Sequence, residues 1–152
     1  SPSTASILAC IRYVGKYNKA GVLLIVKNYT GDRLNFGLAL EKARLEGINV
    51  DWVLVDDDVA LKNSELTVGR RGLCGTIFIH KIAGALAEQR RSLNEIKDFI
   101  NMILKNDLIS TIGVSLSGRV ALPGENSQMS SLNDNHQIEI GLGIHGGNIK
   151  EF

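Results

Sequence analysis

The chain has 152 residues, of which 44% are hydrophobic and 22% charged, and its formal net charge is +1. This length and apolar content predict one globular domain with its own core and argue against a disordered or low-complexity chain. A near-neutral chain has no overall field to attract nucleic acid or an anionic membrane, so we expect neither as a partner.

The chain shows no sign of a membrane span or of secretion. Its longest aliphatic run, 22–26, is far shorter than the ~20 residues of a membrane-spanning helix, and its first six residues do not resemble a signal peptide. Cys10 and Cys74 lack CxxC spacing, which favours two buried free thiols, with a disulfide between them left open. We therefore expect a cytoplasmic protein.

The first third of the chain alternates helical and extended patterns. Residues 7–17 are compatible with a short helix, and the β-branched run 22–26 predicts a buried strand. A polar turn at 27–32 precedes apolar residues at near-helical spacing, which predict a helix that ends at Gly47.

The middle of the chain repeats this alternation. Residues 50–55 read as a second strand, and a glycine-rich turn at 69–75 leads into an apolar stretch, 76–89, that predicts a buried helix containing His80. Ser92 and Glu95 have the spacing of a capping box that opens a further helix.

The last third predicts two more strands, at 109–116 and 137–142, separated by a long loop. Alternating strands and helices indicate an α/β fold with a mixed or largely parallel sheet and flanking helices. Ligands bind such sheets at the carboxyl ends of the strands, so the turns at 27–32 and 143–147 are the candidate sites.

The turn at 27–32 carries two residues with suitable chemistry. Lys27 offers a positive charge and three donors, and the Asp32 carboxylate could hold or deprotonate a hydroxyl group. Alternatively, Asp32 or Thr30 caps the helix that follows. The two roles do not exclude each other.

The segment Gly-Leu-Gly-Ile-His-Gly (141–146) matches the dinucleotide-binding pattern GxGxxG by letters only. That pattern requires a following helix and a later acidic residue, and only six residues follow Gly146, so we reject it. His145 stands between glycines after a strand, where a neutral imidazole could act as a nucleophile or base, or could simply be a surface histidine.

Two charged clusters remain. Asp56, Asp57 and Asp58 could bind a hard cation, but a solvated acidic loop, or Asp58 capping a helical turn, explains them better. Arg70 and Arg71 between glycines could cradle phosphate, or they could pair with those acids.

Taken together, these motifs resemble the dihydroxyacetone kinase family, in its substrate-binding K (DhaK) domain. The motifs follow one another along nearly the whole chain in the same order as in the family. Their sequences most resemble those of the eukaryotic single-chain members, including the animal triokinase/FMN cyclases. It is carried by Lys-Asn-Tyr-Thr-Gly-Asp (27–32), Asp-Asp-Asp (56–58), Gly-Arg-Arg-Gly-Leu-Cys-Gly-Thr (69–76), His-Lys-Ile-Ala-Gly-Ala (80–85) and Gly-Ile-His-Gly (143–146).

The resemblance implies an ATP-dependent kinase for dihydroxyacetone or glyceraldehyde. It implies that His145 adds covalently to the substrate carbonyl as a hemiaminal, and that Lys27 and Asp32 contact the bound substrate. Asp32 would orient the reacting hydroxyl or accept its proton. These roles agree with the chemistry of the side chains.

Departures from the family pattern define what we expect of this chain alone. The family's Gly-Ser-Gly-His segment and its ATP-binding L domain are missing, and Gly147 stands where the family usually has Glu. We therefore expect residues 1–152 to be the central part of a K domain, inactive in isolation, with no cofactor or metal site of its own. ATP and Mg²⁺ would bind the L domain, in the same or another chain, and the K domain would form a homodimer. The alternative is a truncated, non-catalytic binding or interaction module.

Overall fold

A computed structural model describes residues 1–61, 69–115, 139–141 and 150–151. The order of elements confirms the α/β class predicted from the sequence. The elements are α1 (Thr4–Tyr17), β1 (Val22–Lys27), α2 (Thr30–Leu45), β2 (Val50–Val55), the 3₁₀ turn η1 (Val59–Leu61), α3 (Gly75–Glu88), α4 (Leu93–Lys105), β3 (Val114–Ser115), β4 (Glu139–Ile140) and β5 (Lys150–Glu151).

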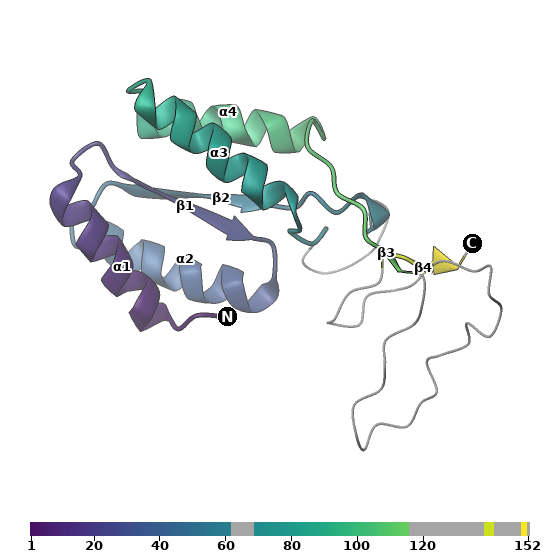
Figure 1. The fold of residues 1–152 in the computed structure, drawn as a ribbon. Coiled ribbons are helices and arrows are strands. Elements are labelled where there is room, and N and C mark those ends of the chain that lie inside the picture. Colours follow the sequence, from purple (N-terminus) through teal and green to yellow (C-terminus); the bar gives the residue numbers. More distant parts are fainter. Residues whose placement is uncertain (62–68, 116–138, 142–149, 152) are drawn as a thin grey trace, which may run out of the picture.

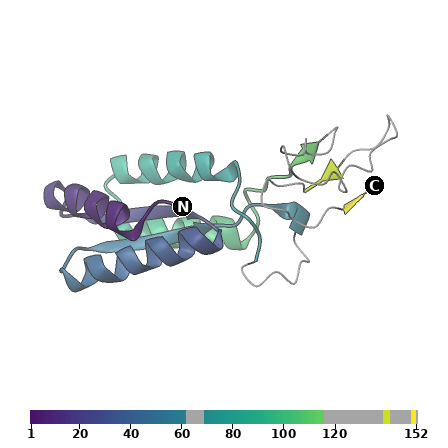
Figure 2. The ribbon, with the colours of Figure 1, turned by 90° about the horizontal axis from the view of Figure 1, so that it is seen from below.

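The two long strands form a parallel pair at the centre of the fold. Val22 pairs with Val50 and Lys27 with Val55, so β1 and β2 end side by side. Helices α1 and α2 cover one face of this pair, and α3 and α4 cover the other (Figure 1). Strands β3, β4 and β5 form a separate antiparallel ribbon beyond the carboxyl ends of β1 and β2 (Figures 1 and 2). The parallel pairing of β1 with β2 and the flanking helices confirm the predicted α/β fold, and the antiparallel strands lie in a sheet of their own.

Each face of the parallel pair has its own apolar core, as expected for strands covered on both sides. Ile11 and Leu40 are buried between the first two helices and the sheet. Val53, Ile79 and Ile100 are buried on the opposite face, beneath α3 and α4. The two cores hold the strand ends, and therefore the residues that follow them, in a fixed position.

Two predicted helix boundaries are confirmed and one is not. Ser92 and Glu95 form the reciprocal capping box at the start of α4. Gly47 follows α2 with a φ of +77°, the left-handed conformation that favours glycine. Helix α2, however, begins at Thr30 with Tyr29 as its N-cap and no side-chain cap hydrogen bond. The capping alternative for Asp32 or Thr30 is therefore wrong.

Several burial expectations also need correction. Helix α3 packs only one face on the sheet, so Ile77, Phe78 and His80 are exposed rather than buried. Cys10 and Cys74 are free thiols, as expected, but both are exposed. They lie at surface positions of α1 and at the start of α3, where no core covers them.

The later part of the chain agrees only in part with the strand predictions. Within 109–115, the described part of the predicted strand 109–116, Val114–Ser115 alone forms a strand, and Thr111 makes an isolated bridge to Asp58. The predicted strand 137–142 is described at Glu139–Ile140, and the predicted loop and the turn 143–147 lie outside the described residues. Across the described ranges, no helix combines the length and apolar content of a membrane span.

Candidate functional site at the carboxyl ends of the strands

Lys27 and Asp32 lie on either side of the connection between β1 and α2, in the region 27–32 that the sequence predicted to be a turn. Lys27 is the last residue of β1 and is exposed, with its Nζ 5.6 Å from the centroid of the Tyr29 ring. Asp32 is half-buried in the first turn of α2, where a carboxylate is favoured by the helix dipole. The turn thus presents a cation and a carboxylate at the carboxyl end of the sheet.

Asn28, between these two residues, fixes the turn. Its backbone N–H donates to the Val55 carbonyl at 2.9 Å, and its buried side chain donates to the Arg70 carbonyl at 2.7 Å. Its side-chain oxygen accepts from Arg33 at 3.3 Å. The role of Asn28 could not be predicted, because an asparagine after a strand gives no sign of its distant partners.

The Gly-Arg-Arg-Gly loop crosses directly over the ends of both strands. A Cβ on Gly72 would lie 2.4 Å from the Val55 carbonyl oxygen and 2.8 Å from both the Asn28 nitrogen and the Lys27 Cα. Real Cβ atoms do not approach backbone this closely, so only glycine fits here. The loop is thereby brought against the Lys27–Asn28 backbone.

Asp57 holds the start of α3 in place through hydrogen bonds to its backbone. Its carboxylate is 1% exposed and accepts from the backbone N–H groups of Leu73 at 2.6 Å and Gly75 at 2.7 Å. It also accepts from the Thr111 hydroxyl. All these donors come from the protein, so Asp57 acts as a structural acceptor.

Asp58 is fully buried and pairs with Arg71. Nε and Nη2 of Arg71 lie 2.7 and 2.6 Å from Oδ2 of Asp58, while Oδ1 accepts from the Ala60 N–H at 3.0 Å. This confirms both the predicted pairing of an arginine with these acids and the cap that Asp58 makes for a helical turn. Nη2 of Arg71 also donates to the Gly141 carbonyl at 2.6 Å.

The acidic cluster does not fit a metal ion. The carboxylates of Asp57 and Asp58 are occupied by backbone N–H groups, a hydroxyl and a guanidinium, which leaves no set of free oxygen ligands. In the described ranges, no group of three or more His, Cys, Asp or Glu side chains is arranged to hold a metal.

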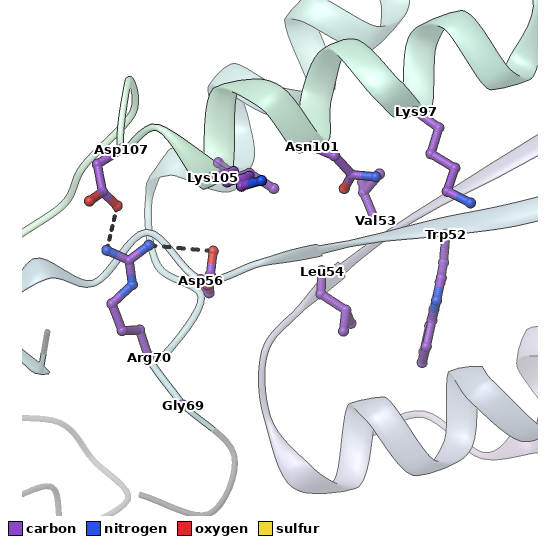
Figure 3. A pocket seen from close by; sticks show the side chains of 11 residues that line it. Trp52, Val53, Leu54, Asp56, Gly69, Arg70, Lys97, Asn101, Lys105 and Asp107 are labelled. Atoms are coloured by element: carbon purple, nitrogen blue, oxygen red, sulfur yellow. Dashed lines mark hydrogen bonds and ion pairs between the residues drawn. The ribbon is translucent and has the colours of Figure 1, made fainter. Parts of the chain in front are cut away.

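Arg70 makes the second ion-pair cluster, at the mouth of a groove of about 760 Å³ between β2 and α4 (Figure 3). Its guanidinium lies 2.5 Å from Asp107 and 3.7 Å from Asp56. Burial raises the pKa of Asp56, and the positive charge of Arg70 acts in the opposite direction. The ion pair with Asp56 agrees with the predicted pairing of the arginines with the acids at 56–58, whereas the contact with Asp107 was not predicted.

Tyr29 completes the polar surroundings of the turn. Burial raises the pKa of its phenol, the nearby acids Asp58 and Asp32 raise it further, and Arg71 opposes them. The phenol therefore keeps its proton at neutral pH.

The third predicted site residue, His145, lies outside the described residues, as does Gly147. Gly141, which precedes His145 by four positions, is described and buried. Its N–H donates to the Gly113 carbonyl at 2.9 Å and its own carbonyl accepts from Arg71. The structure thus joins the start of the glycine-rich segment to the loop that crosses the strand ends.

Comparison with known proteins identifies the family to which these features belong. Triokinase/FMN cyclase of Rattus norvegicus is 53% identical over 146 residues, which cover 96% of this chain and 24% of that protein. The dihydroxyacetone-binding subunit DhaK of the PTS-dependent dihydroxyacetone kinase of Lactococcus lactis is 50% identical over 126 residues, covering 83% of this chain and 37% of the subunit. This chain therefore spans well under half the length of either curated relative.

Solved structures agree with these relatives. The native form of the dihydroxyacetone kinase of C. freundii is 42% identical and superposes with a TM-score of 0.79, over 98% of this chain and 26% of the kinase. The same kinase in complex with AMP-PNP and Mg²⁺ superposes with a TM-score of 0.78. Residues 1–150 match the Dak1 domain. The resemblance carried by the sequence motifs is thus confirmed, and the chain belongs to the Dak1 domain family.

Proposed function

We propose that this chain is the substrate-holding part of an ATP-dependent kinase for dihydroxyacetone or glyceraldehyde. The observation that supports this most directly is the position of Lys27 and Asp32 at the carboxyl end of β1. They occupy this position in a chain that is 50% identical to a protein named as a dihydroxyacetone-binding subunit. The site lies where parallel sheets bind their ligands.

In the proposed reaction, His145 captures the ketone covalently. The lone pair of its neutral imidazole attacks the carbonyl carbon, the carbonyl π electrons move to the oxygen, and that oxygen takes up a proton as the imidazole loses its own. The product is a hemiaminal, with no change in oxidation state. A covalent bond fixes a small substrate that offers few polar groups for recognition.

The turn after β1 supplies the remaining contacts in this proposal. Lys27 donates a hydrogen bond to a substrate oxygen, and Asp32 accepts one from the hydroxyl that is to be phosphorylated. The Asp32 carboxylate thereby orients that hydroxyl and takes its proton as the phosphoryl group is transferred.

ATP would supply the phosphoryl group, and Mg²⁺ would neutralise its charge. Both would bind a separate L domain, in the same or another chain. The commitment of Asp57 and Asp58 to internal contacts supports placing the metal outside the described residues. We also propose a homodimer, on the basis of the family resemblance.

The covalent step can be tested on the full-length protein that contains this chain. Intact mass spectrometry under non-denaturing conditions should detect a dihydroxyacetone adduct, which His145→Ala abolishes. The matched control is His80→Ala, because His80 is an exposed histidine of α3, and its replacement should preserve the adduct. An adduct that persists in His145→Ala would overturn the covalent role. A wild-type protein with neither adduct nor kinase turnover would favour the non-catalytic interaction module.

A further inference from the structure

Asn28 joins three parts of the fold at the carboxyl end of β1. Its backbone N–H donates to the Val55 carbonyl at 2.9 Å, which ties it to the end of β2. Its side-chain amide donates to the Arg70 carbonyl at 2.7 Å, across 42 positions of sequence. Its side-chain oxygen accepts from Arg33, near the start of α2, at 3.3 Å. One residue therefore connects the strand ends, the Gly-Arg-Arg-Gly loop and α2.

The side chain of Asn28 has a defined orientation. It is buried, with 6% of its surface exposed. The Arg70 carbonyl can only accept a hydrogen bond and the Arg33 guanidinium can only donate one, so the NH₂ group faces Arg70 and the oxygen faces Arg33. A short side chain that offers both a donor and an acceptor is needed to make these two contacts.

The loop that accepts from Asn28 is itself held in place. The guanidinium of Arg70 lies 2.5 Å from Asp107, beyond the end of α4 (Figure 3). A Cβ on Gly72 would lie 2.8 Å from both the Asn28 nitrogen and the Lys27 Cα, so the loop backbone lies directly against the turn. Asn28 thus fastens the turn to a fixed surface.

The two proposed substrate contacts are direct neighbours of this network. Lys27 precedes Asn28 in the chain, and Asp32 precedes Arg33. Between them, the Tyr29 N–H donates to the Lys27 carbonyl at 2.9 Å, and the Arg33 N–H donates to the Tyr29 carbonyl at 2.8 Å. A displacement at Asn28 would therefore reach Lys27 on one side and Asp32 on the other.

Asn49 provides a contrast at the opposite end of the parallel pair. It immediately precedes β2, its carbonyl accepts from the Val22 N–H at 2.9 Å, and its side-chain amide donates to the Ala20 carbonyl at 3.1 Å. It therefore makes the same kinds of contact as Asn28, with a backbone bond across the strand pair and a side-chain bond to a distant carbonyl. Asn49 is exposed, however, and lies at the amino ends of the strands, away from Lys27 and Asp32.

We infer that Asn28 is a positioning residue for the substrate site. It sets the position of Lys27 relative to Asp32, so that one can donate to a substrate oxygen while the other accepts from the hydroxyl group. This inference rests on the function proposed above. Asn28 needs no contact with the substrate for this role.

The main test compares Asn28→Ala with the matched control Asn49→Ala in the full-length protein. Each variant loses one side-chain hydrogen bond to a distant carbonyl and gains no charge. We expect Asn28→Ala to raise KM for dihydroxyacetone and to lower kcat, each by about tenfold, since small misplacements of reacting groups are costly. Asn49→Ala should leave both within about twofold. A role in stability alone would lower the amount of active protein but would not change KM.

A second measurement asks whether Asn28 acts through Asp32. The Asn28→Ala change is repeated in a protein that already carries Asp32→Asn. If Asn28 positions Asp32, its replacement should lower kcat by less than about threefold in this background, because residues that act together are not additive. Losses in kcat that multiply in full would overturn the positioning role.

The outcomes separate the two proposals. A folded Asn28→Ala variant with unchanged KM and kcat overturns the positioning role and leaves the proposed function intact. A wild-type protein that does not phosphorylate dihydroxyacetone overturns the proposed function, and the positioning role with it. If Asn28→Ala does not fold, Asn28→Asp replaces it, with Asn49→Asp as control and the same expected direction. The aspartate keeps an oxygen for Arg33 but has no donor for the Arg70 carbonyl.

Discussion

The amide of Gly75 donates to Oδ2 of Asp57 at 2.7 Å, and a Cβ on Gly75 would lie 2.6 Å from that same oxygen. The first residue of α3 therefore sits directly on a buried carboxylate that follows β2. This relationship sets the start of α3, and with it the position of the Gly-Arg-Arg-Gly loop that leads into the helix.

Replacing Gly75 by alanine should destabilise the fold. The added methyl group would clash with the Asp57 carboxylate and with Cγ2 of Ile109, which is 2.8 Å from the Cβ position. We expect a loss of about 1 to 3 kcal/mol in the free energy of unfolding, measured by urea denaturation. Gly84→Ala in the same helix is the control, because nothing lies within 4 Å of that Cβ position. It should stabilise the protein by up to about 1 kcal/mol, and equal effects at the two positions would contradict this account.

Asp32→Asn should affect turnover much more than stability. Helix α2 has no side-chain cap hydrogen bond, so the substitution removes only a favourable charge near the helix N-terminus, worth up to about 1 kcal/mol. If Asp32 orients the substrate hydroxyl as proposed, its loss should lower kcat by about a hundredfold in the full-length protein. Asp98→Asn, at an exposed position of α4, should change neither quantity. Full activity with a large drop in melting temperature would show that Asp32 is structural.

The stability of the fold should fall at acid pH partly through Asp51. Burial alone would raise the pKa of Asp51, but hydrogen bonds from Lys97 and the Trp52 N–H, with the charge of Arg44, hold it below its ordinary value. The folded state therefore binds this proton less readily than the unfolded chain. The resulting stabilisation is complete above the unfolded pKa of about 3.9 and is lost as the pH falls through the lower folded pKa.

Asp51→Asn isolates this contribution. It should cost about 1 to 2 kcal/mol at neutral pH, through the lost 2.5 Å contact with Lys97, and the difference from wild type should shrink as the pH falls below about 4. Glu41→Gln is the control, because Glu41 also pairs with Arg44 but is 65% exposed. It should change stability by less than about 0.5 kcal/mol. A difference for Asp51→Asn that is constant with pH would refute the charge-based explanation.

Isothermal titration calorimetry of this 152-residue chain with millimolar ATP and Mg²⁺ should show no binding. The carboxylates of Asp57 and Asp58 are already occupied by protein donors, and Arg71 is neutralised by Asp58. The full-length protein is the comparison and should bind. Heat of binding from the chain alone would place a nucleotide site within it.

Local features of the fold could be predicted from the sequence, because they depend on neighbouring residues. The strand at 22–26, the capping box of Ser92 and Glu95 and the helix end at Gly47 each have a signal within a few positions. The start of α2 was missed because Tyr29, an unusual N-cap, is held there by backbone contacts.

Features that depend on distant residues could not be predicted in the same way. The apolar sequence of α3 indicated a buried helix, but burial depends on what packs against each face, and Ile77 and Phe78 face away from the core. The role of Gly72 requires the ends of two strands to be in place. The position of Lys27 and Asp32 at the end of a strand could be predicted from the sequence, whereas no spacing rule links Arg71 to Gly141.

The long sequence separation between Arg71 and Gly141 has a consequence for the order of folding. Closing a loop of 70 positions costs more chain entropy than pairing β1 with β2 through the single helix between them. We therefore expect the parallel pair and its helices to form first, and the contact between Arg71 and Gly141 to form last. Pulsed amide labelling during refolding would then protect Val53 before Gly141. A chain stopped at the early stage would already have both apolar cores but not yet the contact between Arg71 and Gly141.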